Sequence, residues 1–148
     1  EVCEWDKRVH RISRHGAERL LLEIPHGSGT DQKSRWMASW LKAQLRKVVA
    51  PRLALRAARM DVRPTRWGLR PMRTKWGSCN PEKGIVWLNT ELVKKPEAMI
   101  DYVVVHELAH LVSPRHDALF TETMDRELRQ WRRMRKELNG LPLAAWDA

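Results

Sequence analysis

The sequence predicts an α+β fold in which a small antiparallel or mixed sheet packs on a buried central helix, with further helices toward both ends of the chain. Three observations lead to this prediction. Apolar residues recur at three- and four-residue steps over residues 32–60, and again toward the C-terminus, which is the helical period. Short apolar or alternating runs separated by turn residues occupy 62–89. Residues 96–112 are apolar on nearly every side, as is typical of a helix buried in a core.

The N-terminal region is predicted to form a hairpin followed by two helical pieces. Residues 8–25 hold two short apolar runs around a His-Gly turn, and a proline ends the second run. Asp31 is a good N-cap for the helix that follows. That helix runs from Gln32 to about Val49, Pro51 ends or kinks it, and Leu53–Met60 continues it at an angle.

Residues 62–89 are predicted to form the sheet. Thr65–Leu69 alternates between polar and apolar side chains, which is typical of a half-buried strand. Lys75–Asn80 leads into a turn at Pro81–Gly84, and Ile85–Asn89 is then a buried strand. A strand pair just before the central helix offers a sheet edge, which an extended peptide can join through backbone hydrogen bonds.

The central helix is predicted to run from Pro96, which suits the first helical position, to about Val112. Val103–Val105 favours a strand locally, because β-branched residues are enriched in strands. The length of the segment and its all-round apolarity favour a buried helix instead. Asp101 is a charged residue inside this apolar segment, so we expect it to have a partner.

The same helix carries His106-Glu107-Leu108-Ala109-His110, an H-E-x-x-H pattern. Residues four apart lie one turn above each other, so His106 and His110 can aim two imidazoles at one point. Glu107 lies about 100° round the helix, where it can reach a water on a metal without binding the metal itself. Two ligands and a general base are what a hydrolytic zinc site requires. The alternative is two ordinary histidines on a helix.

A third ligand is predicted just beyond the end of this helix. Pro114 disfavours helical geometry at Ser113, so the helix should stop there. On a continuous helix His116 would lie about 240° round from His110 and face away, but a break lets the chain turn back. His106, His110 and His116 with one water would make a tetrahedral site for one zinc ion per chain. Three imidazoles also suit nickel, cobalt or copper, and the alternative for His116 is a surface histidine.

The C-terminal region is predicted to form one helix, capped by Asp117 and ending at Asn139-Gly140, before a loose tail at 141–148. The apolar face of this helix holds Phe120, Met124, Leu128, Trp131, Met134 and Leu138. The other face is basic and holds Arg126, Arg129, Arg132, Arg133, Arg135 and Lys136. This face could contact nucleic acid, although a charge run on a helix is usually a solvated face.

Composition narrows the class of protein. The net charge of +10 raises affinity for nucleic acids and other anions, but a solvated arginine-rich surface explains it more simply. No apolar run approaches the ~20 residues that span a bilayer, and the start of the chain lacks the apolar core of a signal peptide. Cys3 and Cys79 form no disulfide framework, which fits a reducing, cytoplasmic setting. We expect a single domain over 1–148, made of an N-terminal hairpin and helices (1–61), a sheet and active-site core (62–117), and a C-terminal helix and tail (118–148).

Four segments carry a resemblance: W-G-S-C at 76–79, G-I-V-W-L-N at 84–89, I-D-Y-V-V-V-H-E-L-A-H-L at 100–111, and His116 with Phe120. Together they resemble the YgjP-like metal-dependent hydrolases, within the SprT/WLM group of zincin-like metallopeptidases. The resemblance implies a zincin-like fold, zinc on His106, His110 and His116, and Glu107 as the base. The sequence departs from the family at Arg115-His116-Asp117, where Asn-His-Ser is usual. That stretch looks more like the WLM branch, which is linked to proteolysis of DNA–protein crosslinks.

These features predict a zinc-dependent hydrolase, with a metallopeptidase acting on a peptide or protein as the leading interpretation. Glu107 would take a proton from the attacking water and pass it to the leaving amine. Tyr102, Arg73 and Arg115 are candidates for stabilising the oxyanion. One alternative is a metal-dependent hydrolase of nucleotides or other phosphorylated molecules. Another is a basic, DNA-associated protease or binding module of WLM type, which would bind nucleic acid through Arg126, Arg129, Arg132, Arg133 and Lys136.

Overall fold

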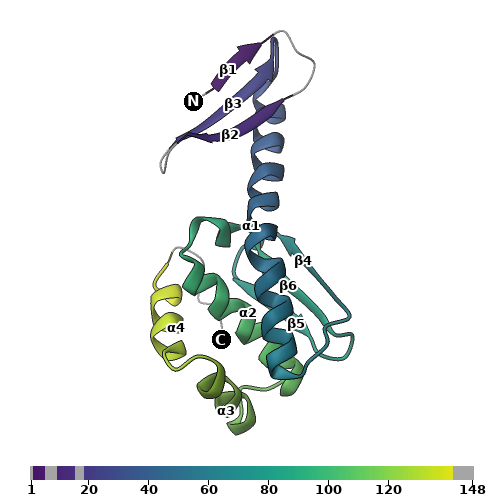
Figure 1. The fold of residues 1–148 in the computed structure, drawn as a ribbon, viewed down its shortest axis with the longest axis vertical. Coiled ribbons are helices and arrows are strands. Elements are labelled where there is room, and N and C mark those ends of the chain that lie inside the picture. The colour runs from purple at the N-terminus through teal and green to yellow at the C-terminus, as the bar shows by residue number, and fades with distance from the viewer. Residues whose placement is uncertain (1, 6–9, 16–18, 142–148) are drawn as a thin grey trace. The chain divides into compact units, whose positions relative to one another are not determined.

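The computed structural model describes residues 2–5, 10–15 and 19–141 of the chain (Figure 1). The chain divides into two compact units between Ala43 and Gln44, inside one long helix, and each unit has its own three-stranded sheet. The predicted α+β class with a small mixed sheet is confirmed. That residues 1–148 form a single domain stays a prediction. In the described part of the chain, no helix combines the length and apolarity needed to cross a membrane.

The first unit begins with a sheet of strands β1 (Val2–Trp5), β2 (Arg11–His15) and β3 (Arg19–Pro25), in the order β1-β3-β2. Strands β2 and β3 are antiparallel, which confirms the predicted hairpin, although Gly16 of its turn lies outside the described residues. Strand β1 pairs with β3 in parallel and was not predicted. The sequence of β1 is short and mixes polar with apolar residues, so it carries no clear strand pattern. The strand forms its ladder of backbone hydrogen bonds only by pairing with β3.

Helix α1 (Thr30–Met60) runs without interruption through Pro51, so the prediction of two helical pieces is wrong. It also begins before Asp31, which therefore lies in the first turn and is not the N-cap. A proline inside a helix costs about 3 kcal/mol, because it removes one backbone hydrogen bond and crowds the preceding turn. A stripe of buried residues on both sides of Pro51 offsets this cost. It consists of Leu45, Val49, Leu53, Ala57 and Met60, spaced at three and four residues.

The second sheet consists of β4 (Arg66–Arg70), β5 (Gly77–Asn80) and β6 (Ile85–Asn89), in the order β4-β6-β5. Strands β4 and β6 are parallel, whereas β5 and β6 form an antiparallel hairpin. The predicted sheet and its turn are therefore confirmed, and β5 is an edge strand. A short 3-10 helix η1 (Thr90–Lys94) connects β6 to the central helix.

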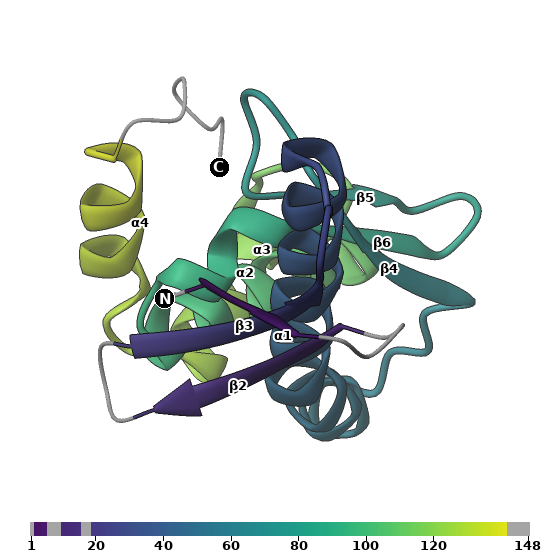
Figure 2. The ribbon, with the colours of Figure 1, turned by 90° about the horizontal axis from the view of Figure 1, so that it is seen from above.

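Helix α2 (Glu97–Val112) is the predicted central helix and packs against β5, β6, α3 and α4. In Figure 2 it lies between the second sheet and α4. Val103–Val105 is helical and fully buried, so burial on all sides overrides the local strand preference. Pro96 is the N-cap, one residue before the predicted place. The expected partner of Asp101 is Arg56 of α1, whose Nη2 lies 2.6 Å from Oδ2.

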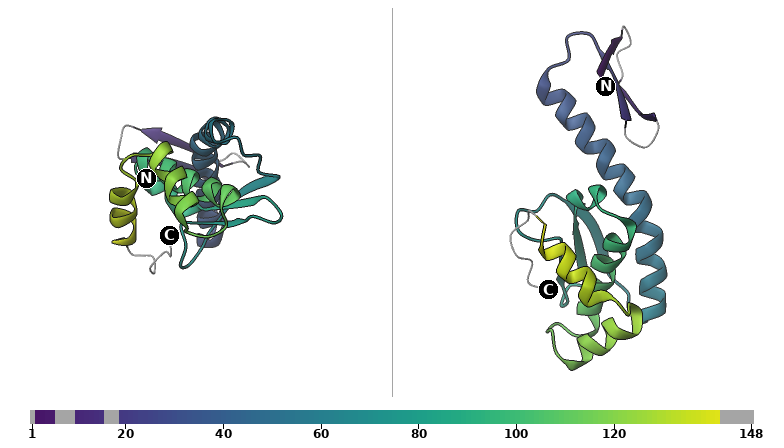
Figure 3. Two further views of the ribbon diagram at one scale, coloured as in Figure 1. Left: turned by 90° about the horizontal axis from the view of Figure 1, so that it is seen from below. Right: turned by 90° about the vertical axis from the view of Figure 1, so that its left-hand side faces the viewer.

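The predicted single C-terminal helix is wrong: the chain forms α3 (Ala118–Glu127) and α4 (Trp131–Asn139), which point in different directions (Figure 3). Leu128 between them is extended, with φ −141°. Two side-chain interactions favour this break. Arg56 donates to the backbone carbonyl of Glu127 at 3.3 Å, and the Trp131 indole donates to Asp125 at 2.7 Å. The predicted loose tail falls almost wholly on 142–148, outside the described residues.

Candidate active site

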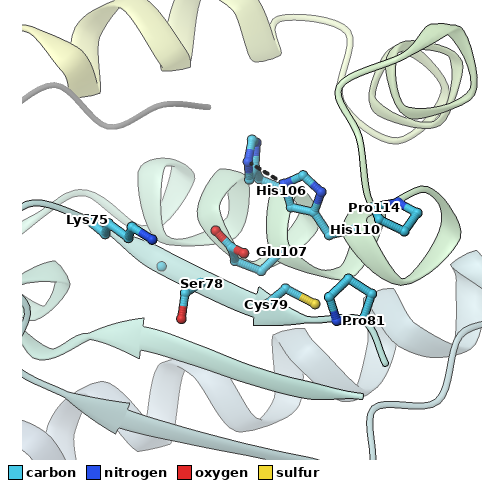
Figure 4. Close-up of a pocket in the computed structure, with 9 residues that line it drawn as sticks. Lys75, Ser78, Cys79, Pro81, His106, Glu107, His110 and Pro114 are labelled. Atoms are coloured by element: carbon cyan, nitrogen blue, oxygen red, sulfur yellow. Dashed lines mark hydrogen bonds between the residues drawn. The ribbon is translucent and has the colours of Figure 1, made fainter. Parts of the chain in front are cut away.

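Three histidines bring their ring nitrogens together at the C-terminal end of α2. The Nε2 atoms of His106 and His110 are 3.2 Å apart, and those of His110 and His116 are 3.1 Å apart. One ligand nitrogen from each ring lies within 4.8 Å of the other two. His106 is buried, His110 is half-buried and His116 is exposed, so the cluster has one open side. Figure 4 shows His106 and His110 side by side on α2.

The loop after α2 returns His116 to the other two histidines. The helix ends at Val112, and Ser113 is extended with φ −141° and ψ 119°, which confirms the predicted break. The hydroxyl of Ser113 donates to the Asp117 carboxylate at 2.8 Å, and that carboxylate accepts the backbone N–H of Phe120 at 3.0 Å. Asp117 thus caps α3, as predicted, and also closes the loop that carries His116.

The surroundings of His106 and His110 disfavour the charged form of both rings, and the neutral imidazole is the form that binds a metal. Burial lowers the pKa of His106 to about 2, with further lowering from His110, His116 and Arg135. Burial and then His116 also lower the pKa of His110. The Nδ1 of His110 lies 3.3 Å from the carbonyl oxygen of Ser113. A proton on that nitrogen donates to the carbonyl and leaves the Nε2 lone pair facing the cluster.

The spacing of the nitrogens suits a tetrahedral metal ion. Nitrogens about 2.0–2.1 Å from zinc in a tetrahedral site are about 3.3–3.4 Å apart, close to the 3.1–3.2 Å separations seen here. Hydrogen bonds among the rings cannot satisfy this arrangement alone, because the Nε2 of His110 faces both neighbours and carries at most one proton. The donor set and its geometry therefore fit a divalent metal.

The ring of Phe120, from α3, packs against all three imidazoles of the cluster. Its ring centroid lies 5.1 Å from that of His106 and 4.8 Å from those of His110 and His116. Only 2% of Phe120 is exposed, so the ring is held in the core. The sequence placed Phe120 on an apolar helix face and in the family resemblance, but its contact with all three imidazoles depends on the turn at Ser113.

Glu107, His106 and His110 line a pocket of about 450 Å³. The other walls of this pocket come from β5, from the loop before β5, and from the loops that follow β5 and α2. Only 2% of Glu107 is exposed. Burial raises the pKa of Glu107 to about 8, and the positive charge of Lys75 opposes that rise. Figure 4 shows the carboxylate between α2 and β5, beside the two histidines. The predicted base thus lines one pocket with two of the three predicted ligands, His106 and His110.

The segment Trp76–Cys79 gains a physical explanation that the sequence did not supply. Trp76 is buried, with 2% exposed, and anchors the start of β5 in the core. A Cβ at Gly77 would lie 2.8 Å from Cγ and 2.9 Å from Oε1 of Glu107, so β5 approaches Glu107 more closely than any side chain permits. Cys79 also lines the pocket, and burial, followed by the charge of Glu107, raises its pKa to about 12.

The three predicted oxyanion candidates lie elsewhere. Tyr102 is fully buried in the core, and Arg73 and Arg115 are exposed. None of them is among the described residues that line the pocket. Lys75 does line the pocket, although the sequence analysis did not single out this residue. The sequence feature that could have drawn attention to Lys75 is its position directly before the W-G-S-C segment.

Three of the six basic residues predicted to form one face of the C-terminal helix pair with acidic side chains. Arg132 lies 2.7 Å from Asp125, and Arg133 lies 3.1 Å from Glu137. Arg126 also contacts Glu127, at 3.4 Å. These pairs favour the interpretation of this face as a solvated surface.

Comparisons with known proteins extend these observations. The model of the YgjP-like metallopeptidase domain matches residues 5–141. Two crystal structures of metallopeptidase zymogens have a similar fold. Abylysin of Pyrococcus abyssi is 17% identical with a TM-score of 0.59, and the match covers 65% of this chain and 97% of that chain. Jannalysin of Methanocaldococcus jannaschii is 16% identical with a TM-score of 0.55, and the match covers 62% and 94%. No curated protein matches the sequence. The likeness confirms the predicted zincin-like fold.

Proposed function

The chain belongs to the YgjP-like metallopeptidase family, and from this premise we propose that it is a single-zinc peptidase in which His106, His110 and His116 hold the metal and Glu107 is the general base. One observation carries the proposal: the imidazoles of His106, His110 and His116 converge on one point, and two of them, His106 and His110, line the same pocket as Glu107. With a single water or substrate oxygen as the fourth ligand, such a site is catalytic, whereas a structural zinc site has four protein ligands.

Each residue has a separate part in the reaction. A zinc ion on the three histidines would supply a Lewis acid that polarises the scissile carbonyl and acidifies the attacking water. Glu107 accepts a proton from that water as its oxygen attacks the carbonyl carbon. The carboxylic acid then gives this proton to the nitrogen of the leaving amine as the C–N bond breaks. Ser113 and Asp117 hold the third histidine in place, and Phe120 sets the tilt of all three rings.

The substrate is proposed to be an extended peptide lying along β5. This strand is the edge of its sheet, and Gly77–Cys79 lines the same pocket as Glu107. An edge strand offers unpaired backbone N–H and C=O groups, to which a peptide can add as a further strand. We also propose a reducing, cytoplasmic setting, because both Cys3 and Cys79 are free thiols.

Metal content and turnover test this proposal directly. Purified protein is expected to hold about one zinc ion per chain by elemental analysis, and to cleave members of a fluorogenic peptide library. Glu107→Gln should retain zinc and lose cleavage, whereas the matched control Glu122→Gln, an exposed residue of α3, should retain both. Unchanged cleavage by Glu107→Gln would contradict the mechanism. Release of pyrophosphate from nucleoside triphosphates, with no peptide cleaved, would favour the nucleotide-hydrolase alternative.

A further inference from the structure

The active-site pocket contains a positive charge that the proposed mechanism does not use. Lys75 is the one lysine or arginine among the described residues that line the pocket. It follows the exposed loop after β4 and directly precedes the buried Trp76. Figure 4 shows its side chain directed along the pocket toward Glu107.

The backbone at Lys75 is held in place by a buried side chain. Asn89, with no exposed surface, donates from Nδ2 to the carbonyl oxygens of Lys75 at 2.8 Å and Met72 at 3.0 Å. The backbone N–H of Asn89 donates to the carbonyl of Trp76 at 2.9 Å. These bonds attach the loop to the end of β6, which fixes where the lysine side chain leaves the backbone.

Lys75 forms no ion pair with an acidic side chain in the described part of the chain. The charge of Lys75 counteracts the rise in the pKa of Glu107, but among the described residues no ion pair joins these two side chains. An exposed lysine is ordinarily solvated. Here the backbone of Lys75 is held by Asn89, and the side chain lines the pocket that contains Glu107, so its ammonium group can reach a substrate bound in that pocket.

We propose that Lys75 binds a carboxylate of the substrate, so that the enzyme selects acidic peptides. This inference rests on the proposed peptidase function and names its substrate class. The carboxylate can belong to an Asp or Glu side chain or to the C-terminus of the substrate, since both present the same charged oxygens. The net charge of +10 acts in the same direction, because it draws anionic chains toward the protein.

Matched peptides test the selection. Each pair differs by Glu against Gln at one position near the cleaved bond, or by a free against an amidated C-terminus. The wild-type enzyme should prefer one charged member of these pairs, and the preferred pair identifies the source of the carboxylate. Lys75→Gln should raise KM for that peptide about tenfold with kcat little changed, which corresponds to about 1.4 kcal/mol of binding. Lys75→Arg should keep most of the preference, because it keeps the charge.

The matched control is Lys83→Gln, which removes the same charge from the exposed turn between β5 and β6, outside this pocket. It should leave KM and the preference unchanged. Equal KM values for Lys75→Gln and Lys83→Gln, or a wild-type enzyme that cleaves neutral peptides as well as charged ones, would overturn the inference while leaving the peptidase function intact.

A binding measurement decides the matter without turnover. Fluorescence anisotropy with the preferred labelled peptide, or with a Glu-rich peptide if nothing is cleaved, compares zinc-loaded Glu107→Gln with Glu107→Gln/Lys75→Gln. The double variant should bind about tenfold more weakly, with no such difference for the neutral peptide. Equal binding would refute the role of Lys75. If the wild-type enzyme cleaves no peptide, the proposed function fails, and the binding comparison still tests Lys75.

Discussion

Replacing Gly77 with alanine should remove most of the activity while leaving the metal bound. The added Cβ would lie 2.8 Å from Cγ of Glu107 and 3.0 Å from a methyl carbon of Val103. Carbon atoms in good contact are about 3.5–4.0 Å apart, so Glu107 or β5 must move by roughly 0.7 Å or more. A displacement near 1 Å of a group that must meet a water costs about 100-fold in rate.

The same overlap sets the expected effect on stability. Extra atoms in a well-packed region cost about 1–3 kcal/mol, so the variant should fold and unfold at a lower temperature. The histidines are carried by α2 and by the loop that Ser113 and Asp117 hold, and not by β5, so zinc content should stay at about one per chain. The assay is therefore kcat/KM on a cleaved peptide, with zinc content and thermal unfolding measured on the same samples.

Gly29→Ala is the matched control, because a Cβ at Gly29 meets nothing within 4 Å. It should change neither turnover nor zinc content. A Gly77→Ala enzyme with wild-type kcat/KM would refute the view that Gly77 makes room for the base. Loss of zinc from a folded variant would show that β5 supports the histidines instead, which also contradicts the reasoning.

Three further predictions concern other contacts. Phe120→Leu should keep the fold but weaken zinc binding about 10–100-fold, because the variant loses the ring that orients the three imidazoles. Competition with a chelator measures the zinc affinity, and an unchanged affinity would contradict this role of Phe120. Arg56→Met should lower the free energy of unfolding in urea by about 3 kcal/mol, since it leaves the buried Asp101 with only the more distant Arg52, at 3.8 Å. Adding Asp101→Leu should restore part of the loss. In a variant with Cys3 replaced by serine, the rate of alkylation of Cys79, measured by mass spectrometry, should be slow at pH 8. The rate should rise with pH toward the pKa of about 12, because only the thiolate reacts. A plateau of the rate below pH 10 would contradict the burial of the thiol.

The local sequence features that bring the three histidines together act over only a few residues. The four-residue spacing of His106 and His110 follows from the helical period, whatever surrounds the helix. Pro114 stops α2 through a steric clash with its own neighbour, and Asp117 caps α3 through a backbone N–H three residues away. Interactions this short do not need the rest of the fold. The residues proposed to bind zinc could therefore be named before the structure was known.

The helix boundaries that were wrong depend on partners far away in sequence. Pro51 does not end α1, because burial of residues on both sides of it outweighs the lost hydrogen bond. The break between α3 and α4 is stabilised by the local hydrogen bond from Trp131 to Asp125 and also by Arg56, more than 70 residues earlier in the chain. Local propensity has no information about such contacts.

The wall of the pocket that faces Glu107 was also decided by packing. Gly77 and Glu107 are 30 residues apart, and only the pairing of β5 with β6 and the seating of α2 bring them into contact. Lys75 reaches the pocket because Asn89, on another strand, holds its carbonyl. The chemistry of the histidines and the base was readable from spacing, because a helix fixes it locally. The pocket wall that faces these residues could not be predicted from spacing, because contacts between residues far apart in the sequence build it.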